Sequence, residues 1–223
     1  MSELGFLAVG CVLAVVGALR AAWSPCGLSM LASLTPLGER SRGFSWRVTA
    51  SAYAVGAIGG AAAAGAALGA IGSLLPGGTG WRSVSLLLVV AAALAIDASP
   101  LRRRLPVTRR QVNEDWMARY RGWVYGAGFG AQLGVGFTTL VACAAVYATF
   151  AAELLSPSPA IGALLGVAFG TVKALSLLPA RVGRDRFSLL ALHRRIARLE
   201  PASAWTVVAG ELLVLAVVAR VLT

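Results

Sequence analysis

Long apolar runs separated by short polar stretches dominate the pattern along this chain. A helix that crosses a bilayer needs about 20 consecutive, mainly apolar residues. Six runs suit this role: residues 4–22 (continuing with interruptions to 37), 48–75, 83–98, 122–154, 160–180 and 203–222. Turn-forming residues mark the intervening stretches 38–47, 76–82, 99–121, 156–159 and 181–202. The pattern predicts an all-α polytopic membrane protein with six transmembrane helices in one membrane domain, residues 1–223.

The composition excludes a water-soluble domain. The chain is 58% hydrophobic and 13% charged, with a mean hydropathy of +0.78, whereas soluble domains carry about 25% charged residues. Three Cys cannot build a disulfide scaffold, and one His leaves little room for a histidine metal site. The sequence contains no haem, flavin or nucleotide motif. We therefore expect neither a metal nor a cofactor.

The net charge of +11 reports membrane topology. Most of the 20 basic residues lie in the first, third and fifth polar stretches, while the opposite side holds only Arg82 and Arg220. Loops rich in Lys and Arg stay in the cytoplasm. This asymmetry predicts a protein of the cell (plasma or inner) membrane with both termini extracytoplasmic. It also argues against nucleic acid as a partner, because the lipid bilayer accounts for the charge.

A basic stretch within 181–202 has an amphipathic pattern. Phe187 and Leu190 precede His193 and Arg194 at helical spacing. Such a pattern predicts a short helix lying on the anionic inner leaflet. A docking face for an acidic cytosolic partner is the alternative interpretation.

Two apolar runs, one opening each half of the chain, are far longer than one straight span requires. Each is interrupted near its middle, the first at 23–27 and the second at 134–139. Paired interruptions predict a 3+3 inverted repeat, with halves 1–98 and 122–223 and broken first and fourth helices. The residues expected to line a site at these breaks are Pro25, Gly27, Gly134, Gly136, Thr138 and Thr139. The alternative is that Pro25 only kinks a helix.

Glycines recur at four-residue spacing in several runs. The series are Gly122, Gly126, Gly130 and Gly134; Gly162, Gly166 and Gly170; Gly56 and Gly60; and Gly65 and Gly69. Stripes of small residues let helix backbones approach closely, so they predict a tightly packed bundle.

Four polar residues lie inside the apolar runs: Arg20, Gln132, Lys173 and Glu211. Ionisable groups in spans are unfavourable and usually face a cavity or one another. From their depth along the predicted helices, we expect a Lys173–Glu211 pair with Arg20 nearby. A purely structural link between helices is the alternative.

The segment Ser24-Pro25-Cys26-Gly27-Leu28, followed by Leu31 and Pro36, resembles the opening of the CcdA/DsbD family of membrane thiol–disulfide carriers. The run from Gly134 to Leu140 follows the fourth span of that family in part. The chain departs from the family at two positions, where Thr139 replaces a Pro and Leu140 replaces the second Cys. The nearest thiol, Cys143, lies three residues further on, and Cys11 matches no family position.

The resemblance implies a transmembrane thiol–disulfide electron carrier with Cys26 and Cys143 as its catalytic residues. Reducing equivalents would pass from cytosolic thioredoxin to an extracytoplasmic thioredoxin-like or cytochrome c maturation partner. A Cys that follows Pro25 at a helix start is also placed to favour the thiolate nucleophile. If the resemblance holds, the activity is that of a thiol–disulfide oxidoreductase.

Two other functions remain open from the residues. One is a small-solute transporter, most naturally for an anion, on a related exporter-like scaffold with a site formed by Arg20, Lys173 and Glu211. The other is a non-catalytic membrane assembly subunit in which Cys26 has no chemical role.

Overall fold

The computed structural model describes residues 3–76, 78–101, 105, 115–137, 141 and 143–222. In these residues the chain is all helical, without strands. Five spans are long and apolar enough to cross a membrane: α1 (Glu3–Ala21), α4 (Trp46–Ser73), α5 (Thr79–Asp97), α9 (Pro159–Leu175) with the 3₁₀ helix η2 (Leu178–Val182), and α10 (Arg186–Leu222). The chain is thus a multi-pass helical membrane protein, as its apolar pattern predicts.

The remaining helices are short: α2 (Pro25–Ser33), α3 (Pro36–Ser41), α6 (Trp116–Arg119), α7 (Gly122–Val135) and α8 (Ala144–Leu154). The predicted fourth span, 122–154, is divided into α7 and α8, and α7 ends within the predicted interruption at 134–139. Gly136 ends α7 with a φ of +77°, a conformation that L side chains rarely adopt. The structure thus has five long spans and this divided segment in place of six spanning helices.

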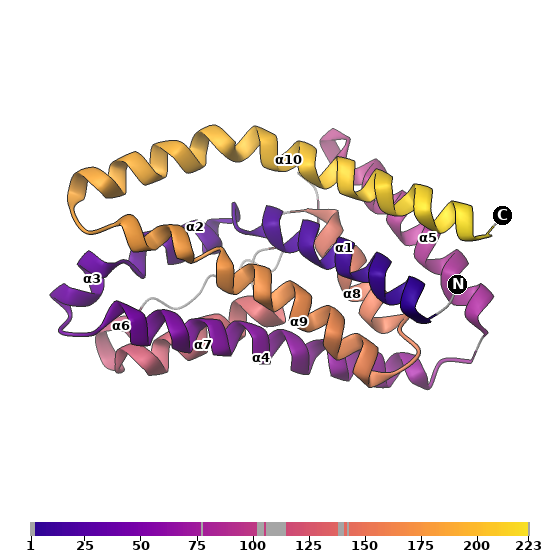
Figure 1. Cartoon of the computed structure of the whole chain (residues 1–223), viewed down its shortest axis with the longest axis horizontal. Helices are drawn as coiled ribbons and strands as arrows, with labels where there is room; N and C mark the ends of the chain where they lie inside the picture. The colour runs from indigo at the N-terminus through magenta and orange to yellow at the C-terminus, as the bar shows by residue number, and fades with distance from the viewer. Residues whose placement is uncertain are drawn as a thin grey trace.

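The predicted loop 181–202 is wrong from Arg186 onward. Residues from Arg186 onward form one helix with the last span, and α10 continues through Pro201. Asp185 caps its start, accepting a hydrogen bond from the Ser188 N–H (2.9 Å) that holds the pKa of this carboxyl below its usual range. Because the basic half shares a helix with the span, it extends from it (Figure 1) instead of forming a separate surface helix.

Helix α4 packs against both α7 and α9 and lies along the lower edge of the bundle in Figure 1. A Cβ atom at Gly130 or Gly134 of α7 would fall on a backbone carbonyl of α4, and so would one at Gly166 or Gly170 of α9. The glycine stripes therefore bring these backbones into direct contact, which confirms the predicted close packing. In a bilayer such contact stabilises helix association by van der Waals packing.

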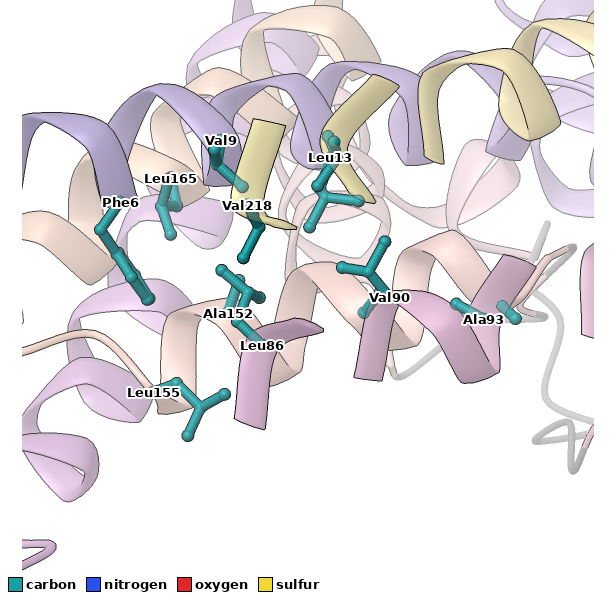
Figure 2. Close-up of a cluster of buried hydrophobic side chains, with 13 residues drawn as sticks. Phe6, Val9, Leu13, Leu86, Val90, Ala93, Ala152, Leu155, Leu165 and Val218 are labelled. Atoms are coloured by element: carbon teal, nitrogen blue, oxygen red, sulfur yellow. The ribbon is translucent and has the colours of Figure 1, made fainter. Parts of the chain in front are cut away.

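A second packing centre joins α1, α5, α8, α9 and α10. Figure 2 shows its buried side chains, with Leu13 of α1 and Val90 of α5 among them. In Figure 1, α1 begins and α10 ends at the same end of the bundle, while α3, α6 and the start of α10 lie at the other.

Candidate functional site

The first interruption is a built helix start. Ser24 is the N-cap of α2, and its Oγ accepts a hydrogen bond from the Gly27 N–H (3.1 Å). Pro25 follows at the first helical position, where its missing N–H removes no helical hydrogen bond. Cys26 comes next and is only 2% exposed. A Cβ atom at Gly27 would meet the Ala22 carbonyl oxygen at 2.5 Å, so glycine is needed for the chain to turn here.

The second interruption also places a thiol at a helix start. Cys143 is the N-cap of α8, with extended backbone angles (φ −158°, ψ 160°), and is 3% exposed. Gly134 and Gly136 lie at the end of α7 before it. The predicted site residues Thr138 and Thr139 lie outside the described residues. Cys26 and Cys143 thus each lie at the start of the second helix of an interrupted segment, where the helix dipole favours negative charge.

Lys173 of α9 links the two cysteines electrostatically. Its ammonium interacts with both Cys143 and Cys26. The side chain is buried, at 4% exposure, and its Nζ lies 5.8 Å from the centre of the Phe169 ring. No ion pair involves Lys173 in the part of the chain that the structure describes. A buried cation beside two thiols stabilises whichever of them becomes a thiolate.

The expected Lys173–Glu211 pair is not formed, because each polar residue has another neighbour. The side chain of Glu211 lies against Asp97. Arg20 forms an ion pair with Glu200 (2.7 Å) and donates to Ser203 Oγ (3.3 Å), which ties α1 to α10. Depth along a helix predicted the wrong partner because it carries no information about which face each residue occupies.

Gln132 lies in α7 one turn before the interruption and is half-buried. Its backbone carbonyl accepts a weak hydrogen bond from the Gly136 N–H at 3.4 Å. The structure therefore places Gln132 at the end of α7.

Asp97, which sequence reasoning missed, orders the start of α8. Its carboxylate oxygens accept hydrogen bonds from the N–H groups of Ala144 (2.8 Å) and Ala145 (3.0 Å). Asp97 ends α5, 47 residues earlier in the chain, so local sequence could not reveal this capping role. The signal available was an acidic residue at the very end of an apolar run. Through Ala144, Asp97 fixes the backbone next to Cys143.

A cavity of about 580 Å³ opens beside this acid, between the end of α5 and the middle of α10. Its lining includes Asp97, Ser99, Glu200 and Trp205. Two of these residues carry carboxyl groups, so water that enters the cavity can reach Asp97.

Sequence reasoning also missed a second polar cluster, which joins α3, α4 and α7. Glu39 is fully buried and accepts hydrogen bonds from Tyr125 Oη (2.7 Å), Thr49 Oγ1 (2.6 Å) and Arg42 (2.7 Å). The sequence pattern placed Glu39 in a polar stretch and gave no sign of this cluster. Tyr125 and Thr49 come from other helices, and Arg42 comes from the turn that follows α3. The carboxylate is well supplied with donors, which indicates a structural role.

Comparison with known proteins finds relatives that cover most of the chain. It is 33% identical over 213 residues to the methylamine utilization protein MauF of Paracoccus denitrificans, covering 92% of this chain and 76% of that protein. It is 32% identical over 202 residues to MauF of Methylorubrum extorquens, covering 86% and 68%. It is 34% identical over 163 residues to MauF of Methylophilus methylotrophus, covering 69% and 55%. No family model matches, and no solved structure matches significantly.

Proposed function

Since the chain belongs to the MauF family of methylamine utilization proteins, we propose that it serves methylamine utilization as a membrane thiol–disulfide carrier. Its redox pair is Cys26 and Cys143. The observation that carries the proposal is their common setting: both thiols begin a helix after an interruption, and both interact with Lys173. The same setting supports the resemblance to the CcdA/DsbD family, with Cys143 in the role of the cysteine that Leu140 replaces.

The proposed cycle is a pair of thiol–disulfide exchanges. A thiolate of a cytosolic thioredoxin attacks Cys26 Sγ in the Cys26–Cys143 disulfide, and Cys143 leaves with the electron pair and takes a proton. The second thiol of the donor then attacks the mixed disulfide and releases reduced Cys26. The dithiol next reduces the disulfide of an extracytoplasmic thioredoxin-like or cytochrome c maturation partner. Two electrons and two protons pass in each cycle.

This cycle needs the two halves of the chain to face opposite sides in turn. We assign α1–α5 and α7–α10 to a 3+3 inverted repeat, in which α1–α2 and α7–α8 are the corresponding broken segments. The arginine-rich end of the bundle faces the cytoplasm and the end with both termini faces outward, in a plasma or inner membrane. The paired interruptions and the asymmetry of basic residues support this arrangement.

One observation favours an anion transporter as the second candidate. Lys173 is a buried cation for which the described residues provide no ion pair, and such a group suits an anionic solute. Transport of this kind depends on the lysine and does not require either thiol. The two functions can therefore be distinguished by whether they require Cys26 and Cys143.

Trapping a mixed disulfide tests the carrier directly. The oxidised protein in detergent is mixed with a thioredoxin that lacks its resolving cysteine, and the covalent adduct is measured on a non-reducing gel. We expect an adduct with the wild type and with the control Cys11→Ser, and none with Cys26→Ser or Cys143→Ser. An adduct that persists in Cys26→Ser, or absence of any adduct, contradicts the carrier. Anion flux in vesicles that survives both substitutions but not Lys173→Met would instead establish the transporter.

A further inference from the structure

Glu211 of α10 is a fully buried carboxyl group without a hydrogen-bond donor among the described residues. Its side chain is 0% exposed, and no donor in the described part of the chain reaches either carboxyl oxygen. Burying an ionised carboxylate without a hydrogen bond or a counter-ion is highly unfavourable. Such a group needs a bound cation or a proton of its own.

The neighbour of Glu211 is another carboxyl group, that of Asp97. Two carboxyl groups attract only when one carries a proton, because two adjacent negative charges repel. Asp97 already accepts the N–H groups of Ala144 and Ala145 at the start of α8, which favours its ionised form. A proton shared by this pair would therefore reside on Glu211, with Asp97 as its acceptor.

We propose that Glu211 and Asp97 form a proton-binding site that holds one shared proton at neutral pH, and that this proton passes to Cys143 when the disulfide opens. The second half of this statement rests on the proposed carrier function. When a donor thiolate attacks Cys26 Sγ, the Cys26–Cys143 bond breaks and its electron pair stays on Cys143 Sγ. The Glu211 proton then neutralises that thiolate, and a proton from water restores the pair.

The surroundings of Cys143 fit this role. Cys143 interacts electrostatically with Asp97, Arg20 and Glu211, which come from three different helices, and with Lys173 of α9. Arg20 does not neutralise the carboxyl pair, because its guanidinium is already paired with Glu200. The cavity of about 580 Å³ reaches Asp97 and gives the pair a place to exchange its proton with water.

Infrared spectroscopy of the purified full chain at neutral pH detects the bound proton without any activity. A protonated carboxylic acid has a C=O stretch above the amide I band, and we expect this band to lose intensity in Glu211→Gln. Asp97→Asn supplies an amide donor that lets Glu211 ionise, so the same loss is expected there. The control Asp185→Asn removes an exposed carboxylate at the start of α10, whose pKa lies below its usual range, and leaves the band unchanged.

Two outcomes keep this inference separate from the carrier function. If the resting band is identical in wild type, Glu211→Gln and Asp97→Asn, Glu211 is ionised and the proton site does not exist, whatever the thiols do. If the band depends on Glu211, it should lose intensity transiently while the disulfide is being reduced in the wild type, before water restores the proton, but not in Cys143→Ser. A Glu211 band that stays constant throughout reduction overturns the proton transfer to Cys143. The carrier function still stands in that case if the mixed disulfide forms normally.

Discussion

The Asp97 carboxylate accepts a hydrogen bond from the Ala144 N–H at 2.8 Å, across 47 residues of chain. This contact ties the end of α5 to the start of α8, one residue after Cys143. An acid in this position both satisfies free N–H groups and complements the positive end of the helix dipole. The same acid is the partner of Glu211, so one side chain connects the helix start to the buried proton site.

Asp97→Ala removes the carboxylate that accepts hydrogen bonds from the first N–H groups of α8. We expect a loss of about 1–2 kcal/mol in the free energy of unfolding, the usual contribution of an N-cap. Asp97→Asn keeps an acceptor at the same place and should lose less. Unfolding in detergent, followed by circular dichroism, compares the two variants. Equal stability of Asp97→Ala and the wild type would contradict the capping role.

The contact between α4 and α7 predicts a strong dependence on glycine. A methyl group at Gly130 would overlap the Tyr53 carbonyl oxygen, which is backbone and cannot rotate away. Gly130→Ala should therefore destabilise the bundle by about 1–3 kcal/mol. At Gly59, in the same helix pair but with open space around its Cβ position, alanine should stabilise by about 0.5–1 kcal/mol.

Thermal unfolding of these two variants in the same detergent gives the comparison. Opposite shifts are the expected result. Two equal shifts would mean that helix propensity, and not backbone contact, decides the effect.

Tyr125→Phe removes a hydroxyl that donates to the buried Glu39 carboxylate. Hydrogen bonds to charged groups contribute about 1.5–3 kcal/mol, so we expect a loss in that range. Tyr120 is half exposed and makes a ring contact with Trp116 that phenylalanine preserves, so Tyr120→Phe is the matched control with no expected loss. Chemical denaturation of both variants measures the difference, and indistinguishable curves would rule out the Glu39 cluster as a stabilising centre.

Lys173→Met tests the electrostatic link between the two thiols. Removing a buried cation from beside Cys26 disfavours its thiolate, and we expect alkylation of reduced Cys26 by a small maleimide to slow by about tenfold. Arg181→Met removes an exposed cation from η2 and should leave the rate unchanged. The rate is measured in a background with Cys11 and Cys143 replaced by serine. No change on losing Lys173 would exclude its action on Cys26.

The elements dominated by local chemistry are predictable from the sequence. Pro25 cannot continue a hydrogen-bonded helix, and Gly136 permits a left-handed turn, so both interruptions follow from residue type. Close helix packing follows from glycine spacing, but the spacing does not identify α7 and α9 as the partners of α4. Pairing between distant residues does not follow in this way: Asp97 with Ala144, Arg20 with Glu200, and Glu39 with Tyr125 each depend on how the helices dock.

In the basic half of α10, residue type predicts an interruption that the structure does not have. Its charges suggest a loop or a surface helix, because Pro201 stands before the last apolar run. In the structure, loss of one N–H at Pro201 does not end the helix, since the neighbouring hydrogen bonds and the packing of α10 on α1 and α5 remain. Residue patterns cannot weigh one lost bond against that packing.

The central claim is that Cys26 and Cys143 form a reversible disulfide within one chain. Differential alkylation measures it: free thiols are blocked with one maleimide, disulfides are reduced, and the released thiols are labelled with an isotopic maleimide for peptide mass spectrometry. The account predicts that, after oxidation in membranes, Cys26 and Cys143 gain the second label together while Cys11 carries the first, and that Cys143→Ser leaves Cys26 with the first label. Cys26 and Cys143 that both keep the first label after oxidation, while the thiols of an added thioredoxin control become oxidised, would contradict it.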